Sequence, residues 1–218
     1  MARKQDLEGR LKRAQSWIEA AKSLPEENRH GRFVFFYVAF NALYGRRQYE
    51  GDQAEAFKDR QEFLKRFRRL HDYDILNGSN ILRLALESCR QPARNLITNY
   101  FLRNSYWRKS KKSEELVQQF SSLRDRGEAA LSKRRYEQFL DLVLERLTVL
   151  RNQIMHGCVT YGRDSKGLPS LDTGLAVLGV LVPAFYELME RYGRHIEWPP
   201  IPYPRVGSES HPAVDQLH

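Results

Sequence analysis

Residues 136–157, YEQFLDLVLERLTVLRNQIMHG, carry the pattern that decides the fold of this chain. Apolar side chains recur here at alternating spacings of four and three residues, at Tyr136, Leu140, Val143, Leu147, Leu150 and Ile154. Such a series lies along one side of an α-helix and forms a continuous packing stripe. The segment therefore predicts a long, well-packed helix that ends near Gly157.

The opposite side of this helix is mixed in character. At about 100° per residue, Asn152 and His156 lie roughly 160° from the stripe. A second series runs along that side and is half apolar and half polar: Gln138, Leu142, Glu145, Val149, Asn152 and His156. This mixture is typical of a hydrated subunit interface or of a cleft between subunits. We therefore expect this side to face a second chain.

Helical periodicity also dominates outside this segment, which predicts an all-α fold. We expect further helices over residues 6–23, 32–44, 53–70 and 171–192, and two or three shorter ones between 81 and 127. The second helix is apolar nearly all round, which predicts burial, and Gly45 is placed to cap its end. Pro183 is expected to kink the last helix. A glycine-rich loop joins the 136–157 helix to the last one, so we expect the two to pair in an up-down helical bundle.

The length of 218 residues suits one large domain. We expect a single all-α domain over residues 1–195 and a proline-rich C-terminal tail over residues 196–218, since WPPIPYP at 198–204 does not suit a helix. The net charge of +9 and the pI near 9.6 favour an anionic partner such as nucleic acid. The same excess charge can also serve solubility alone.

The cysteines and the apolar stretches point to a cytoplasmic protein. Cys89 and Cys158 form no CxxC motif or Cys/His cluster, so neither a disulfide scaffold nor a structural zinc site is expected. The N-terminus lacks the apolar region of a signal peptide. The most apolar stretches, 33–44 and 175–189, are shorter than the roughly 20 residues of a membrane span, so no membrane association is expected.

Three polar residues at the end of the 136–157 helix suit cleavage of a phosphodiester without a metal. A histidine has an ordinary pKa of about 6.5, so His156 can take up or release a proton near neutral pH. Arg151 offers a permanent charge and a planar guanidinium that matches phosphate. Asn152, one turn before His156, could orient the imidazole or bind a phosphate oxygen. The long Arg151 side chain could also reach His156.

A purely structural interpretation of the same residues is open. Arg151 could bind the last carbonyls of its helix, and His156 could interact favourably with the C-terminal dipole. Gly157 would then supply the left-handed turn that ends the helix.

The hexapeptide Arg151 to His156, R-N-x-x-x-H, resembles the R-x(4–6)-H signature of the HEPN superfamily, whose members are compact all-α domains. Residues 32–45, ending in AFNALYG, resemble the aromatic early helix of some HEPN-like proteins. Some HEPN toxins have a tyrosine at the position of Cys158; here the nearest tyrosine is Tyr161.

The resemblance implies a HEPN-type bundle with extra helices, a homodimer with a composite site, and a metal-independent endoribonuclease that leaves 2′,3′-cyclic phosphates. Arg151 and His156 would be catalytic, Asn152 would support them, and no cofactor would be needed. It also implies a defence or toxin–antitoxin setting, with an antitoxin or another regulatory protein as partner.

A basic and aromatic segment, residues 100–112, is a second candidate for RNA contact, since rings can stack on unpaired bases while basic side chains take phosphates. The side chains expected to bind are Arg103, Tyr106, Trp107, Arg108 and Lys109. The alternative is a helix that buries its rings and ends in a solvated run of charge.

Two other functions stay open. One is a non-catalytic HEPN-like module that binds RNA or regulates. The other is a metal phosphohydrolase of the HD type, with His30, His71, Asp72 and Asp141 as ligands, although the residues around His71 and Asp72 lack the small side chains expected of that family.

Overall fold

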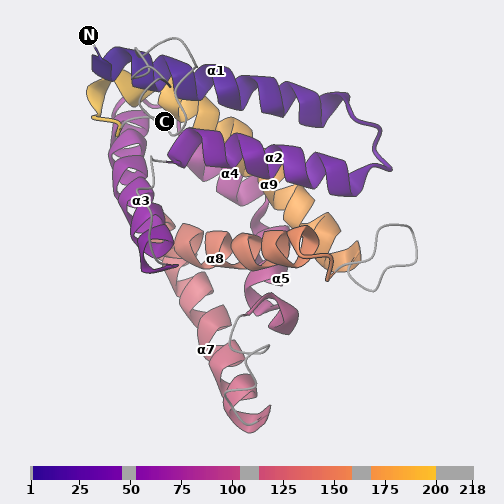
Figure 1. Cartoon of the computed structure of the whole chain (residues 1–218). Helices are drawn as coiled ribbons and strands as arrows, with labels where there is room; N and C mark the ends of the chain where they lie inside the picture. The colour runs from indigo at the N-terminus through magenta and orange to yellow at the C-terminus, as the bar shows by residue number, and fades with distance from the viewer. Residues whose placement is uncertain (1, 46–52, 104–112, 159–167, 200–218) are drawn as a thin grey trace, which may run out of the picture.

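The computed structural model describes residues 2–45, 53–103, 113–158 and 168–199 (Figure 1). These ranges hold eight α-helices and no strand, so the predicted all-α class is confirmed for them. The helices are α1 (Ala2–Ser23), α2 (Arg29–Tyr44), α3 (Gln53–Leu76), α4 (Ile81–Ser88), α5 (Arg90–Thr98), α7 (Ser113–Ser132), α8 (Tyr136–Met155) and α9 (Leu168–Tyr192). Two short 3₁₀ helices, η1 (Tyr100–Leu102) and η2 (Gly193–His195), complete the order.

Helix α9 lies at the centre of the molecule. It packs against α2, α4 and α5, with further contacts to α1 and α3. Because neighbours surround it, apolar residues occupy most of its circumference. The span Pro169–His195 is by length and composition apolar enough to cross a membrane, and half of its most apolar part is buried inside the protein. The helix continues through Pro183.

The expected antiparallel pairing of α8 and α9 is not the main contact of either helix. Helix α8 packs chiefly against α3, α5 and α7, while α9 packs chiefly against α2, α4 and α5. Figure 1 shows α8 and α9 running in clearly different directions. The all-helical class is therefore confirmed, but these two helices do not form a simple up-down pair.

Helix α2 is buried on nearly all sides, as its sequence predicts: none of its residues is fully exposed. Asn28 caps its start by accepting a hydrogen bond from the Gly31 N–H at 3.0 Å. Gly45 caps its end as predicted, with its N–H donating to the Asn41 carbonyl at 2.7 Å, but its φ of −54° forms no left-handed turn. The buried Arg10 guanidinium of α1 instead donates to the carbonyl oxygens of Leu43 and Gly45.

An aromatic cluster joins α2, α3 and α9. Phe40 lies 5.7 Å from Phe63 and 5.9 Å from Phe185 between ring centroids, and Phe67 lies 4.4 Å from Phe185. Offset and edge-on ring pairs of this kind add about 0.5–1.5 kcal/mol each to simple burial. The aromatic residues of the second and third predicted helices therefore form the core of the fold.

The helix ends agree with the predictions to within a few residues, with one larger difference. Helix α3 continues six residues beyond the expected Leu70 and ends at Leu76. It stops just before Gly78, which has φ of +72°, and the Ser79 N–H donates to the Asp74 carbonyl at 3.1 Å. This pairing satisfies carbonyls that a helix end leaves unbonded.

The first residues of the predicted tail belong to the packed body. Ile196 and Trp198 are buried, and the Trp198 indole donates to the Gly193 carbonyl at 2.9 Å. Arg10 donates to the Pro199 carbonyl at 2.9 Å. The expected boundary at residue 195 therefore shifts to at least residue 199; residues 200–218 lie outside the described part of the chain.

Candidate functional site at the end of helix α8

Helix α8 ends in a left-handed turn at Gly157, with φ of +69°. The Gly157 N–H donates to the Ile154 carbonyl at 3.1 Å, and the Cys158 N–H donates to the Gln153 carbonyl at 2.8 Å. These two bonds form a Schellman motif, in which a glycine is the favoured left-handed residue. The structural role considered for Gly157 is therefore confirmed, and His156 is the last residue before the turn.

Arg151 and Asn152 form a pair that is anchored on α2. Nη1 of Arg151 donates to Oδ1 of Asn152 at 2.9 Å. The guanidinium carbon of Arg151 lies 5.7 Å from the centroid of the Tyr37 ring, close enough for a cation–π contact. The Tyr37 hydroxyl shares a 3.3 Å hydrogen bond with Thr148 on α8. Burial raises the pKa of Tyr37, so this phenol stays neutral beside Arg151.

His156 is exposed and stands apart from this pair. Its backbone N–H donates to the Asn152 carbonyl at 2.9 Å, which is an ordinary helix bond. Within the described part of the chain, no hydrogen bond joins the imidazole to Arg151 or to Asn152. The expectations that Arg151 reaches His156 and that Asn152 orients the imidazole are therefore wrong for a single chain, because the Arg151 side chain points to α2.

The second face of α8 is largely covered within the chain. Leu142 and Val149 are buried, and α5, α7 and η1 pack against this helix. A second subunit could therefore contact only part of this face. Gln138 at its start is exposed, and so are Met155 and His156 in the final turn, where Asn152 is partly exposed.

Exposed apolar side chains border this final turn. Met155 is 57% exposed, Phe101 52% and Tyr100 45%. The Gln153 side chain donates to the Phe101 carbonyl at 2.6 Å and so fixes η1 against the end of α8. The start of the predicted basic and aromatic segment therefore lies beside the R-N-x-x-x-H motif. Of the predicted RNA-binding residues, Arg103 follows η1 directly, while Tyr106, Trp107, Arg108 and Lys109 lie outside the described residues.

A fully buried arginine, Arg146, lies one and a half turns before Arg151. Its Nε donates to the Ile97 carbonyl of α5 at 3.5 Å, and Nη1 pairs with the Glu145 carboxylate at 3.0 Å. Burial lowers its pKa, and the nearby Arg103 acts in the same direction. Nothing in the sequence distinguishes this arginine from an exposed one. Its bond to α5 holds α5 and η1 beside the candidate site.

The ligands of the metal-enzyme alternative do not come together. Asp141 accepts hydrogen bonds from Arg60 at 2.8 Å and from Gln61 at 2.9 Å. His30 lies at the start of α2, whereas His71 and Asp72 lie on α3. Among the described residues, no three His, Cys, Asp or Glu side chains are placed to hold a metal ion. The HD-type arrangement is therefore not formed.

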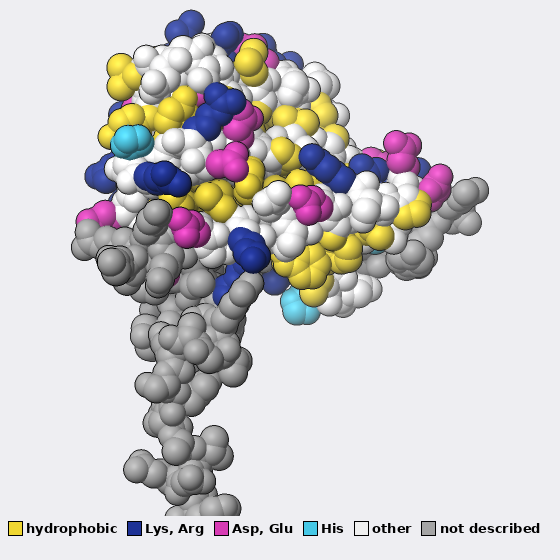
Figure 2. Space-filling model, turned by 90° about the horizontal axis from the view of Figure 1, so that it is seen from above, with side chains coloured by type: hydrophobic (Ala, Val, Ile, Leu, Met, Phe, Trp, Pro, Cys, Tyr) yellow, Lys and Arg dark blue, Asp and Glu magenta, His cyan; other side chains and the backbone are white. Residues whose placement is uncertain are grey.

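The excess of basic side chains does not make every face of the molecule positively charged. Figure 2 shows the face that carries α1, where acidic and basic side chains alternate with apolar ones. A face of this kind favours solubility over nucleic-acid binding. The candidates for nucleic-acid binding are therefore local sites, such as the end of α8.

Comparison of the chain with models of known families, with curated proteins and with solved structures gave no match. The HEPN resemblance therefore stays a prediction that rests on the two sequence segments.

Proposed function

We propose that the chain is a metal-independent endoribonuclease of the HEPN type, acting in the cytoplasm as a homodimer. The observation that supports this proposal best is that α8 ends in the exposed His156, one turn after a fixed Arg151–Asn152 pair, with an exposed rim of Tyr100, Phe101 and Met155. A proton-transfer group, a cation and stacking surfaces are the parts that cleavage of single-stranded RNA requires.

In the proposed reaction, the RNA 2′-hydroxyl attacks the adjacent phosphorus and the bond to the 5′-oxygen breaks. His156 of one copy removes the 2′-hydroxyl proton, and His156 of the other copy gives a proton to the leaving 5′-oxygen. The products are a 2′,3′-cyclic phosphate and a free 5′-hydroxyl. Two histidines are needed, and each chain offers one at this end of α8, which is why a two-fold dimer is proposed.

Arg151 is proposed to bind the phosphate and to balance the charge that builds up on it. A guanidinium carries five N–H donors, and Arg151 uses Nη1 for Asn152, so further donors can reach a phosphate oxygen. Tyr37 and Asn152 would fix the side chain before RNA arrives, which favours catalysis over flexible binding. Asn152 thus acts by positioning Arg151 rather than His156.

The proposed setting is defence or a toxin–antitoxin system, in which an antitoxin or another regulatory protein restrains the nuclease. This part rests on the HEPN resemblance alone.

The second candidate is a non-catalytic module that binds RNA through the same residues. It is favoured by the separation of His156 from Arg151 and Asn152 in the single chain. Both candidate functions use the same surface to bind RNA, but only the nuclease would cleave it.

The proposal is tested by incubating purified wild-type protein with mixed cellular RNA in excess EDTA and analysing the new ends. His156→Ala and Arg151→Ala are expected to abolish cleavage, whereas His195→Ala, a matched exposed histidine on η2, is expected to cleave like the wild type. Circular dichroism checks that each variant is folded. Tight RNA binding without cleavage by the wild type would favour the binding module, and cleavage retained in His156→Ala would overturn the nuclease assignment.

A further inference from the structure

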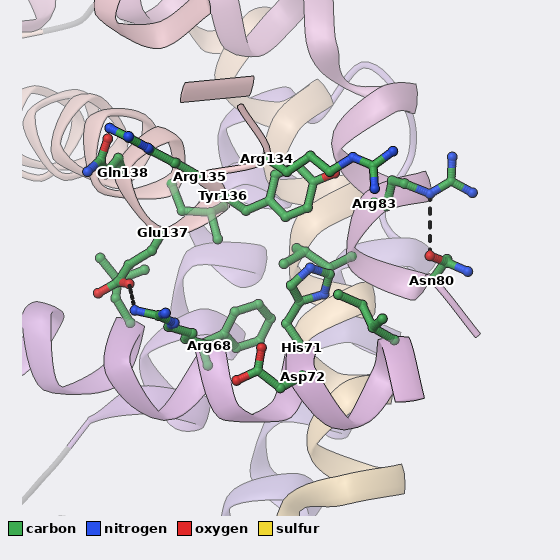
Figure 3. Close-up of a pocket in the computed structure, with 15 residues that line it drawn as sticks. Arg68, His71, Asp72, Asn80, Arg83, Arg134, Arg135, Tyr136, Glu137 and Gln138 are labelled. Carbon is green, nitrogen blue, oxygen red and sulfur yellow. Dashed lines mark hydrogen bonds and ion pairs between the residues drawn. The ribbon is translucent and has the colours of Figure 1, made fainter. Parts of the chain in front are cut away.

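A pocket opens at the start of α8, between α3, α4 and the turn that joins α7 to α8 (Figure 3). Its volume is about 470 Å³, within the range of roughly 300–1,000 Å³ common for small-molecule sites. Since α8 has 20 residues, the pocket and His156 are about 30 Å apart along the helix. The pocket is therefore separate from the candidate nuclease site.

The rim of this pocket is rich in arginine. Four arginines, Arg68, Arg83, Arg134 and Arg135, line it together with only two carboxylates, Asp72 and Glu137. Figure 3 shows Arg83 and Arg134 converging at one end, while Arg68 faces Glu137 at the other. Arg83 also pairs with Glu87, outside the lining, at 3.1 Å, and Arg68 pairs with Glu137 at 3.9 Å, so the excess of positive charge comes from Arg134 and Arg135.

Two of these arginines have no partner for their charge. The side chains of Arg134 and Arg135 form no hydrogen bond or ion pair with any residue in the described ranges. The start of α8 also has no side-chain cap, and its first residues, Tyr136 and Glu137, line the same pocket. Unpaired guanidinium groups beside an uncapped helix start form a binding site for an anion, above all for phosphate.

Arg134 is also held in a left-handed conformation, with φ of +54°. It occupies the position after the end of α7 at which glycine is normally favoured, and the Arg135 N–H donates to the Ala130 carbonyl in the Schellman pattern. An unfavourable residue in such a place suggests selection for its side chain.

The floor of the pocket is apolar and aromatic. Phe67, Leu82 and Leu140 are buried there. The His71 and Tyr136 rings stand edge to face with centroids 5.1 Å apart, and Nδ1 of His71 lies 3.8 Å from a carboxylate oxygen of the buried Asp74. A bare phosphate would leave this floor unused, whereas a flat heteroaromatic base could pack on it.

We propose that this pocket binds a mononucleotide, with the phosphate between Arg83 and Arg134 at the start of α8 and the base against Phe67, His71 and Tyr136. The pocket is small and enclosed by three helices, which suits a single nucleotide better than a continuous RNA strand. The proposal does not depend on the nuclease assignment.

The test is calorimetric titration of the purified full chain, at low ionic strength, with AMP, GMP, CMP and UMP, and separately with adenosine and inorganic phosphate. At least one nucleotide is expected to bind with one-to-one stoichiometry, and adenosine and phosphate are each expected to bind at least about tenfold more weakly. His156→Ala is expected to bind like the wild type, because the nuclease site lies at the other end of α8.

Arg134→Gly and Arg83→Ala are each expected to weaken nucleotide binding by about tenfold or more. Arg134→Gly keeps the left-handed turn, so its loss of binding cannot be ascribed to unfolding. The matched control is Arg194→Ala, which removes an exposed arginine from η2 and is expected to change affinity by less than about twofold.

Three outcomes would overturn the proposal: no saturable binding of any of the four nucleotides, unchanged affinity in Arg134→Gly and Arg83→Ala, or inorganic phosphate binding as tightly as the best nucleotide. Binding of a short RNA oligonucleotide that is weakened by Arg134→Gly, without binding of any single nucleotide, would also overturn the proposal. It would assign the pocket to RNA.

Discussion

His156 has two roles in this account, as the last residue of α8 and as the proton-transfer group. Its orientation depends on the left-handed turn at Gly157, with φ of +69°. A side chain at Gly157 would meet no atom of the described residues within 4 Å, so among them a substitution acts through the backbone alone. This separates the effect of the turn from that of packing.

Gly157→Ala is therefore expected to lower the free energy of unfolding by about 1 kcal/mol, because a left-handed alanine is unfavourable, and to reduce RNA cleavage by displacing His156. Urea denaturation and the cleavage assay measure the two effects. Gly78→Ala is the matched control: it has φ of +72°, equally open surroundings and the same place at the end of α3. The account would be wrong if Gly78→Ala impaired cleavage as much as Gly157→Ala.

His71 gives stability a pH dependence. Burial lowers its pKa, while Asp74, with an oxygen 3.8 Å from Nδ1, and Asp72 oppose that shift. The unfolded chain therefore takes up a proton on His71 at a higher pH than the folded chain does. The stability that this difference provides is fully present above the ordinary histidine pKa and is lost as pH falls through the depressed pKa of the folded state.

Wild-type protein is thus expected to lose more thermal stability than His71→Gln when the pH falls from about 7.5 to about 5. Melting temperatures followed by circular dichroism measure the difference, and both proteins share the contributions of other groups, including His30, whose pKa burial also lowers. Parallel pH profiles of the two proteins would show that His71 does not cause the dependence.

Helix ends determine much of the geometry of both sites. Helices α3, α7 and α8 all end with the Schellman pattern, with Gly78, Arg134 and Gly157 in the left-handed position. Only α7 places a residue with a side chain there, and that side chain lines the arginine-rich pocket.

Arg134→Gly is accordingly expected to raise the free energy of unfolding by about 1 kcal/mol, since glycine adopts the left-handed region without the steric penalty of a side chain. The same urea series that contains Gly78→Ala measures it, and the two changes should have opposite signs. A loss of stability in Arg134→Gly would mean that its side chain serves the fold rather than a ligand.

The helices themselves could be predicted from sequence because apolar periodicity determines them. Residues 136–157 and the aromatic second helix form the expected elements, and Gly157 ends α8 as its place in the pattern indicates. The buried Arg10 and Arg146 could not be predicted, because each bonds to carbonyl groups of other helices that only the tertiary fold brings close. For the same reason the pattern could not show that α5 and α7 cover the second face of α8.

The candidate site was predicted in part. Arg151, Asn152 and His156 lie within one stretch of helix, so their proximity along α8 follows from sequence. The contact of Arg151 with Tyr37 does not follow from sequence, because the two residues are far apart in the chain. The pocket at the other end of α8 does not follow either, because its lining comes from three segments without a shared motif.

The proposed nuclease requires a dimer whose contact lies at the end of α8. Met155 is 57% exposed next to His156, and the exposed Tyr100 and Phe101 lie at the same end of α8. A group of exposed apolar side chains marks a surface that can meet a partner. Met155→Asp is expected to shift the dimer toward monomer and to lower RNA cleavage in parallel, because a buried unpaired carboxylate opposes association.

Sedimentation equilibrium measures the dimer fraction. Leu76→Asp is the control, since Leu76 is 81% exposed at the end of α3, away from α8's final turn. If the wild-type chain is monomeric at the concentrations at which it cleaves RNA, a composite site made by two chains is ruled out.

The composite site itself is tested by RNA cleavage in mixtures of wild-type chain and His156→Ala, refolded or equilibrated together in excess EDTA. If each cleavage event needs the histidines of both copies, random pairing with a ninefold excess of His156→Ala leaves activity only in wild-type homodimers, and activity per wild-type chain falls to about one tenth. Arg194→Ala in the same excess should cause no such loss. Activity per wild-type chain that stays constant as His156→Ala is added would contradict the account, because one chain would then carry the whole reaction.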